Sequence, residues 1–368
     1  MKLQLPRETL LAPLTKIIGA IEKRQTLPIL SNVLIRLAGN RLELTATDLE
    51  IQLVGAISVE PGEDGATTVP ARKLLDIVRL LPEHADLRLD LRNERLTLRS
   101  GTSRYQLATM PEENYPAFDR GAASTHLALS ADLLCQAIDA TQYAMALQDV
   151  RYYLNGLLLM LDAGSLRTVA SDGHRLATWS ATLPEGLETP REMILPRKAA
   201  QELSRLLKGH PEPIRLSLAP NTLTVDLGAL IFSTKLIDGR YPDWQRVMPG
   251  QLDRAYTVPK FELEQALARA KAMTEKPHSI ALSIQTDEVE STLKLAGGTP
   301  ESEVEETLLI EVDGEPIEAG FNAQYLAESL GPISADHVRL QFNQHAANCL
   351  VDHPDEPGYQ AVVMPMRL

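Results

Sequence analysis

The stretch "NYPAFDR" at residues 114–120 returns 126 residues later as "RYPDWQR" at residues 240–246. Other matches keep nearly the same offset. "PARK" (70–73) returns as "LPRK" (195–198), "TATDLEIQLV" (45–54) matches "VASDGHRLAT" (169–178), and Met110-Pro111 returns as Met364-Pro365 after about twice the offset. Several matches in one order and at one period indicate an internal repeat. We therefore expect three copies of one domain.

Each third of the chain begins with apolar residues at helical spacing, and "PARK" and "LPRK" precede a second helical segment. Alternating segments follow, and Gly39-Asn40 between two of them is typical of a two-residue hairpin turn. The predicted fold is α+β, with two helices and antiparallel strands in each copy. The predicted domains are residues 1–123, 124–252 and 253–368. The opening helical positions are Leu10/Pro13/Leu14/Ile17, Leu134/Ala137/Ile138/Thr141 and Leu263/Ala266/Leu267/Ala270.

Composition limits the class of protein. Among 368 residues, 44% are hydrophobic but only 4% are aromatic, so the cores must be mostly aliphatic. Pro6, Arg7 and Glu8 interrupt the apolar stretch that a signal peptide needs, and no apolar run is long enough to cross a bilayer. The two cysteines, Cys135 and Cys349, are too far apart for a metal or redox motif. We expect a reduced, cytoplasmic protein without a membrane partner.

The stretch "SDGHRLA" (171–177) contains the residue types of a hydrolase triad. Ser171-Asp172 is the second copy's version of Thr47-Asp48, so this pair indicates a strand-to-strand bend whose carboxylate binds backbone amides. Neighbouring strand residues point to opposite faces, which disfavours a converging triad, and the nucleophile-elbow motif is absent. The other histidines show no metal spacing, and no phosphate-binding glycine motif occurs. We expect no enzyme activity, no cofactor and no metal.

Charge is unevenly distributed along the chain. The net charge is −13, which argues mildly against nucleic acid as a partner, yet the six helical segments together carry +4. A face of this kind suits the phosphate backbone of a nucleic acid, while ordinary solvated helix faces explain the charge equally well. The loop "QDVRYYLNG" (148–156) adds one cation and two tyrosines, at least one of which is expected in the core.

Along its whole length the chain resembles the beta subunit of bacterial DNA polymerase III, the sliding-clamp family. The motifs that carry the resemblance are "TLPIL", "TDLE", "GATTVPARK", "QDVRYYLNG", "SDGHRLA", "PRK", "DGRYPD" and "VVMPMRL". The resemblance implies three equivalent domains per chain and a ring of two chains joined head to tail. It also implies that the ring encircles duplex DNA without reading its sequence and tethers the replicative polymerase. The implied partners are the polymerase alpha subunit, a clamp loader, other polymerases, ligase and mismatch-repair proteins.

The resemblance also implies three sets of site residues. A partner-peptide pocket would contain Leu154, Ser171, Gly173, His174, Arg175, Leu176, Pro242, Arg246, Val247, Val362, Met364, Pro365, Met366, Arg367 and Leu368, with His174 and Arg175 at its rim and Leu176 in its floor. The residues that would face or touch DNA are Arg24, Arg72, Gln148, Tyr152, Tyr153 and Arg197. Ring closure would pair Lys73, Arg104, Tyr105 and Leu107 with Ala272, Met273, Glu301, Glu303, Glu305 and Glu306. Ala346 and Asn348 depart from the family pattern at the pocket edge.

Two other readings stay open on the residues alone. One is a hydrolase centred on Ser171, Asp172 and His174. The other is a monomeric peptide-binding scaffold with no role on DNA, which a measurement of mass in solution separates from a ring of two chains.

Overall fold

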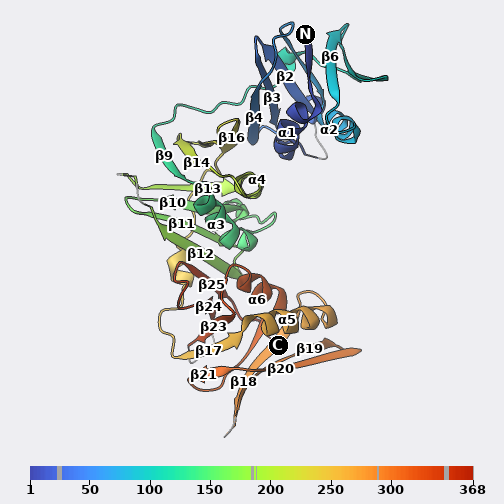
Figure 1. The fold of residues 1–368 in the computed structure, drawn as a ribbon. Coiled ribbons are helices and arrows are strands. Elements are labelled where there is room, and N and C mark those ends of the chain that lie inside the picture. The colour runs from blue at the N-terminus through green and yellow to red at the C-terminus, as the bar shows by residue number, and fades with distance from the viewer. Residues whose placement is uncertain (23–26, 184–185, 188, 288–289, 344–347, 368) are drawn as a thin grey trace. The chain divides into compact units, whose positions relative to one another are not determined.

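The computed structural model describes residues 1–22, 27–183, 186–187, 189–287, 290–343 and 348–367. The chain divides into two compact units, which we call unit 1 (residues 1–134 and 201–236) and unit 2 (residues 135–200 and 237–368). Two of the three divisions between the units fall within helices, α3 (Ala131–Thr141) and α4 (Arg197–Leu207), and the third lies between Leu236 and Ile237. Figure 1 labels the elements along the chain.

Unit 1 contains a large antiparallel sheet. Its strands are β2 (Asn32–Ala38), β3 (Arg41–Thr47), β4 (Ile51–Ser58), β5 (Gly65–Pro70), β9 (Thr125–Ser130), β14 (Pro213–Leu218), β15 (Thr222–Asp226) and β16 (Leu230–Lys235). Their order is β5-β2-β3-β4-β16-β15-β14-β9. Ala38 pairs with Arg41, so Gly39 and Asn40 form the predicted two-residue turn, and Gly39 has the positive φ of 59° that such a turn requires.

A second sheet of unit 1 has the order β1-β6-β7-β8, with strands β1 (Lys2–Pro6), β6 (Asp86–Arg92), β7 (Arg95–Ser100) and β8 (Ser103–Ala108). Leucines alternate with polar residues along β6 and β7, which gives the sheet one buried and one solvated face. Helix α1 (Arg7–Ile17) buries Leu10, Leu14 and Ile17 and packs on β4 and on α2 (Ala71–Leu80). Both helices lie where the apolar spacing predicts them.

Unit 2 repeats the large sheet of unit 1. Its strands are β10 (Gly156–Leu161), β11 (Ser165–Ser171), β12 (Arg175–Thr182), β13 (Arg191–Pro196), β17 (Arg254–Pro259), β21 (Glu311–Asp313), β23 (His337–Phe342), β24 (Cys349–Asp352) and β25 (Tyr359–Val363). The order β13-β10-β11-β12-β25-β24-β23-β17-β21 reproduces that of unit 1 strand for strand, with β21 added at one edge. In particular, the β12–β25 junction corresponds to the β4–β16 junction.

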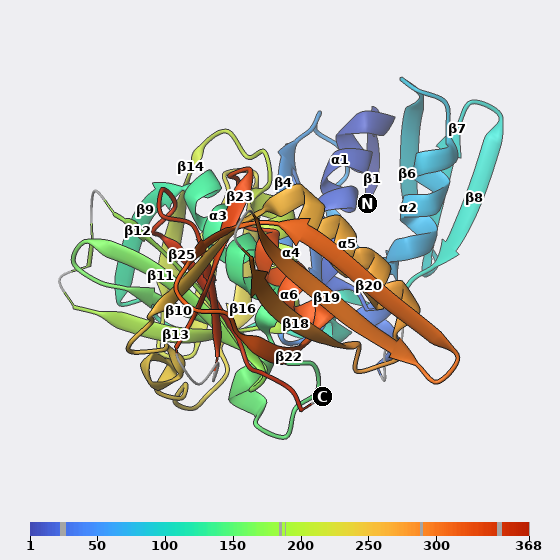
Figure 2. The same ribbon diagram turned by 90° about the horizontal axis from the view of Figure 1, so that it is seen from below.

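The smaller sheet of unit 2 has the order β20-β19-β18-β22, with strands β18 (Ser279–Thr286), β19 (Ser291–Thr299), β20 (Ser302–Leu309) and β22 (Glu318–Asn322). Helix α5 (Lys260–Met273) packs on α6 (Ala323–Leu330) and runs along β19 and β20 (Figure 2). The Asn322 side chain caps α6 by accepting from the backbone N–H groups of Gln324 and Tyr325. Three copies of two four-stranded sheets and two helices account for the described elements, which confirms the repeat.

The cores are aliphatic, as the composition predicts, and leucine is the commonest of the fully buried side chains. Cys135 and Cys349 are buried and not in a disulfide. No helix in the described ranges is both long and apolar enough to cross a membrane. Among the same residues, no group of three His, Cys, Asp or Glu side chains is arranged to hold a metal ion.

Candidate functional site

The bend after β11 is built like the bend after β3. Asp172 Oδ1 accepts from the backbone N–H groups of His174 and Arg175, at 2.9 and 3.0 Å. In the first copy, Asp48 Oδ1 accepts from the residues at the same two positions, at 2.9 and 2.7 Å. The predicted role of the aspartate is confirmed. The third residue of the bend has positive φ in both copies, and this residue is Gly173 in the second.

The geometry of this bend occupies the groups that a hydrolase would need. Ser171 Oγ donates to the carbonyl of Arg175 at 2.8 Å and accepts from the N–H of Gly173. Asp172 is bound to backbone amides and to Arg175, so it does not orient His174 as a base. Ser171, Asp172 and His174 therefore form a turn and no catalytic triad.

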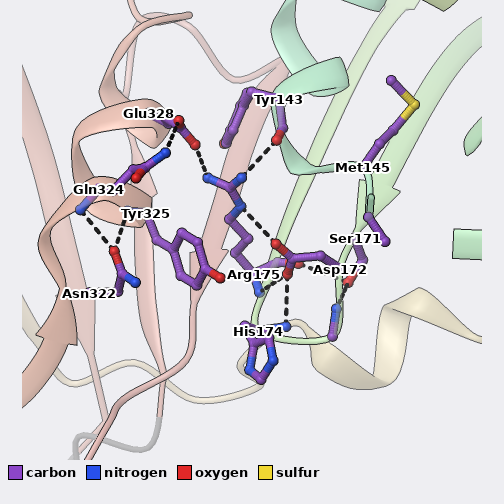
Figure 3. A network of polar contacts seen from close by, with 12 residues as sticks. Tyr143, Met145, Ser171, Asp172, His174, Arg175, Asn322, Gln324, Tyr325 and Glu328 are labelled. Atoms are coloured by element: carbon purple, nitrogen blue, oxygen red, sulfur yellow. Dashed lines mark hydrogen bonds and ion pairs between the residues drawn. The ribbon is translucent and has the colours of Figure 1, made fainter. Parts of the chain in front are cut away.

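Arg175 lies in the interior of unit 2, where it joins the bend to α6 (Figure 3). Its Nε donates to Asp172 at 3.1 Å, its Nη1 is ion-paired with Glu328, and its Nη2 donates to the carbonyl of Tyr143 at 2.8 Å. The guanidinium also stacks 4.4 Å from the ring centre of Tyr325. The expectation that Arg175 lies at a rim is wrong, because these contacts bury it to 8% exposure.

Electrostatics keep this buried cation charged. Burial alone would lower the pKa of Arg175, but the hydrogen bond and charge of Glu328 and the charge of Asp172 raise it above its ordinary value. Beside it, burial raises the pKa of Tyr143 and of Tyr359, whose hydroxyls are 2.7 Å apart. Arg175 thus fixes the start of β12 and, through it, the position of the exposed His174.

An apolar cluster lies on the other side of β12. Leu154, Leu176 and Val362 belong to one buried core cluster, and Val247 packs against it. Leu176 and Val362 are directly opposed across the β12–β25 junction. Leu154 reaches the cluster from the short 3-10 helix η5 (Tyr152–Asn155) and Val247 from η6 (Trp244–Val247). Segments far apart in the sequence thus bring the predicted apolar pocket residues together.

The C-terminal segment runs from this cluster past the bend. The N–H of Met364 donates to the carbonyl of His174 at 2.9 Å, and the N–H of Met366 donates to Gly320 on β22 at 2.8 Å. Met364 and Met366 are half-buried, whereas Pro365 and Arg367 are exposed. The ring of His174 is exposed and stacks at 6.4 Å on Tyr325. Leu368 lies outside the described residues.

The edge of the cluster is polar. Pro242 and Arg246 are exposed, and Arg246 Nε is paired with Asp243 at 2.9 Å. Asn348, expected to depart from the family pattern, donates to the carbonyl of Val247, the last residue of η6, at 3.4 Å. Ala346, the other expected departure, lies outside the described residues.

Sequence reasoning missed several members of the site. Tyr241 is part of the buried cluster, and Trp244 packs against it with Arg167 stacked 5.3 Å from the Trp244 ring. Both aromatic residues belong to the repeated "RYPDWQR" stretch, which was the available signal. Tyr325 and Glu328 carry no such signal, because they are about 150 residues from Arg175 in the sequence.

The residues predicted to meet DNA differ in exposure. Gln148 is exposed, and Tyr152 is 57% exposed. Arg72 is exposed but donates to the carbonyl of Ile21 at 2.7 Å, and the half-buried Arg197 donates to Met145 at 2.7 Å. Tyr153 packs against the apolar cluster, as expected for at least one of the tyrosines. Arg24 lies outside the described residues.

The residues predicted to close a ring lie on two sheet edges and nearby helices. Strands β8 and β20 each end their sheet. On β8, Arg104 is exposed, Tyr105 half-buried and Leu107 buried; Lys73 is exposed on α2. Glu301, just before β20, and Glu303 and Glu305 are exposed, with Glu305 bound to Lys294. Glu306 faces α5 and pairs with Arg269 at 2.7 Å; Ala272 and Met273 are exposed at the end of α5.

Family comparisons match this architecture over its whole length. Models of the DNA polymerase III beta subunit match in order: the N-terminal domain at residues 1–119, the central domain at 128–243 and the C-terminal domain at 245–367. The beta sliding clamp of Escherichia coli K12 is 40% identical, with all of both chains covered. The crystal structure of a Pseudomonas aeruginosa DNA polymerase III beta subunit is 38% identical, covers all of both chains and has a TM-score of 0.94. A second structure from that organism is bound to griselimycin and has the same identity, coverage and TM-score.

Three copies of one α+β domain, joined through continuous sheets, define a DNA clamp. The chain belongs to the DNA polymerase III beta subunit family, the beta sliding clamps.

Proposed function

We propose that two copies of this chain close head to tail around duplex DNA through β8 of one copy and β20 of the other. The supporting observation is the repeat of the sheets. By strand order, β8 corresponds to β16 and β25, while β20 corresponds to β4 and β12. The pairs β4–β16 and β12–β25 form the two junctions within the chain. A third junction of the same kind therefore needs a second copy.

Charge supports this junction. The β8 edge carries the exposed cations Arg104 and, on nearby α2, Lys73. The β20 edge carries Glu301 and Glu303, for which the structure gives no ion pair within the ranges it describes. Opposite charges on the two edges favour head-to-tail pairing and disfavour the pairing of like edges.

On DNA, the proposed ring acts by topology. The exposed cations and tyrosines proposed to face DNA, among them Arg72 and Tyr152, would make weak phosphate contacts without reading bases. Weak contacts let the ring slide while closure prevents escape. Arg24, Gln148, Tyr153 and Arg197 complete the proposed set.

The apolar cluster around Leu154, Leu176 and Val362 is the proposed docking pocket for partner peptides. Burial of two or three apolar side chains contributes about 1.5–3 kcal/mol each before ordering costs, which corresponds to a Kd on the order of micromolar. Held at high local concentration, a polymerase rebinds the primer end without any change in its chemistry. The alpha subunit, clamp loader, other polymerases, ligase and mismatch-repair proteins are the proposed partners, in the cytoplasm, and we assign the chain no catalytic step.

Retention on DNA tests the proposal. Protein loaded on nicked circular duplex should stay bound through gel filtration and leave rapidly once a restriction enzyme linearises the circle. Equal retention on circular and linear DNA would contradict encirclement. A monomeric mass by light scattering would instead favour the peptide-binding scaffold without a ring.

A further inference from the structure

A groove of about 500 Å³ in unit 1 lies on the sheet face where β4 meets β16. Its floor includes Leu34, Thr45 and Gln52, and its wall includes Tyr115 and Arg120. It is separate from the apolar cluster of unit 2, and the family resemblance assigns it no ligand.

The strand register makes this groove the internal counterpart of the proposed peptide pocket. Leu34 pairs with Thr45 on β2–β3 as Leu158 pairs with Val169 on β10–β11. Gln52 pairs with Ser233 across the β4–β16 junction as Leu176 pairs with Val362 across the β12–β25 junction. The wall corresponds too, because Tyr115 and Arg120 of "NYPAFDR" match Tyr241 and Arg246 of "RYPDWQR".

The two floors differ in chemistry. Unit 1 has Thr45 and Gln52 at the positions of Val169 and Leu176 in unit 2. The side chains of Thr45 and Gln52 are each less than a tenth exposed. Met160 in unit 2 corresponds to the exposed Arg36. This floor keeps apolar surface at Leu34 and Val54 and adds polar side chains at Thr45 and Gln52, so it favours a peptide that combines apolar and polar side chains.

The two wall segments differ in their charged residues, because Ala117 and Asp119 stand where unit 2 has Asp243 and Gln245, and Asp119 Oδ1 accepts from the N–H of Gly121. In unit 2, Arg246 is neutralised by Asp243 at 2.9 Å. In unit 1 the equivalent of Asp243 is the exposed Ala117, and Arg120 donates to the neutral Gln52 at 3.3 Å. Across the ranges that the structure describes, no carboxylate is ion-paired with Arg120.

The remaining charges at the groove are already balanced. Arg36 pairs with Glu112 at 3.0 Å and Arg41 with Glu43 at 3.7 Å. Among the charged residues that line the groove, this leaves one cation, Arg120, without an ion pair, on a chain whose net charge is −13.

We propose that the groove beside Arg120 is a second docking site, for an extended partner segment that places a carboxylate against the Arg120 guanidinium and neighbouring residues over Leu34 and Val54. Extended peptide fits because the counterpart pocket has the same strand frame. The acidic side chain follows from the unpaired cation and the polar floor. The choice of an extended peptide rests on the proposed pocket of unit 2, whereas the residues that line the groove all belong to unit 1 and can be tested separately.

Methyl NMR on the full chain tests the site with a defined probe, acetyl-Leu-Asp-Leu-amide, and its neutral isostere, acetyl-Leu-Asn-Leu-amide. The aspartyl probe should shift the methyl signals of Val54 and Ile231, which line the groove. It should bind more tightly than the isostere by about threefold. The signals of Leu176 and Val362 report separately on the other pocket.

Two variants and one matched control sharpen the test. Ala117→Asp restores the acid that unit 2 has at this position, so it should abolish the preference for aspartate while leaving an exposed position otherwise undisturbed. Arg120→Gln should do the same. Arg246→Gln, the equivalent change in unit 2, should leave the Val54 and Ile231 shifts unchanged.

Three outcomes would overturn the proposal. They are an absence of Val54 and Ile231 shifts, equal binding of the two probes, and inorganic phosphate binding as well as the aspartyl peptide. The last result would indicate a simple anion site that does not recognise peptide.

Discussion

Arg175 makes hydrogen bonds or ion pairs with Asp172, Glu328 and Tyr143. Its replacement should therefore lower the free energy of unfolding. Arg175→Met would leave the mostly buried Asp172 and the half-buried Glu328 without their cation. We expect the free energy of unfolding to fall by about 3 kcal/mol. Urea denaturation followed by circular dichroism measures the change.

The matched control is Arg246→Met. Arg246 is also paired with an aspartate three residues away, but in solvent, so its loss should cost less than about 1 kcal/mol. Adding Glu328→Gln to Arg175→Met should recover part of the loss. Equal denaturation midpoints for Arg175→Met and the wild type would refute the role assigned to this network.

Asp149 gives a prediction about pH. Hydrogen bonds from the Arg151 side chain and backbone lower the pKa of Asp149 from 3.8 to about 2. Since the folded-state pKa is depressed, this stabilisation of the loop is present above pH 3.8 and is lost as the pH falls towards 2. Carboxyl-carbon NMR should find the low pKa in the wild type and a rise towards 3.8 in Arg151→Gln.

Asp162 provides the control for this titration. Its pKa is lowered chiefly by the backbone N–H of Gly164, so Arg151→Gln should leave it unchanged. A pKa of Asp149 that does not move in the variant would show that the backbone amide alone accounts for the shift.

At the scale of elements, the sequence predicted the helices and turns, because these depend on the spacing of residues close together in the chain. The helices after residues 6, 70, 196 and 259, the Gly39-Asn40 turn and the aspartate of the bend all rest on contacts between residues close in the chain. The burial of Arg175 depends on Glu328 and Tyr325 on α6, and no periodicity carries that information. The exposure of Tyr152 and the packing of Tyr153 likewise depend on which side of η5 meets the cluster.

The bend and the C-terminal segment give the element-scale prediction. Met364 is bonded to the His174 carbonyl, so the two segments form one wall beside the apolar cluster. If the proposed pocket is correct, His174→Ala should weaken binding of a polymerase alpha-subunit peptide by about tenfold, because the variant lacks the exposed ring that we propose contacts the peptide at the rim. Calorimetry measures it, with His126→Ala in unit 1 as control. Unchanged affinity for the His174 variant would mean that the peptide binds elsewhere.

At the scale of the whole molecule, the proposed junction between chains gives a prediction about mass. Replacing both Ala272 and Met273 with Glu adds charge to the exposed end of α5, beside the acidic β20 edge. We expect folded monomers by light scattering, since two carboxylates at these positions would lose their hydration in the proposed junction, as Ala272 and Met273 would not, and the change disturbs no buried core. Val150→Glu, at a 95% exposed site elsewhere, should remain a dimer. Dimers in the first variant would exclude this edge as the junction.

The likeness of the β4–β16 and β12–β25 junctions to the proposed one between chains has a consequence for dilution. The partners of an internal junction are tethered by the polypeptide, so each experiences the other at an effective concentration that no dilution changes. The partners of the junction between chains meet only by diffusion, and mass action governs them. As the protein is diluted, the proposed β8–β20 pairing between chains should therefore dissociate and single chains should appear. The β4–β16 and β12–β25 pairings within each chain should remain intact.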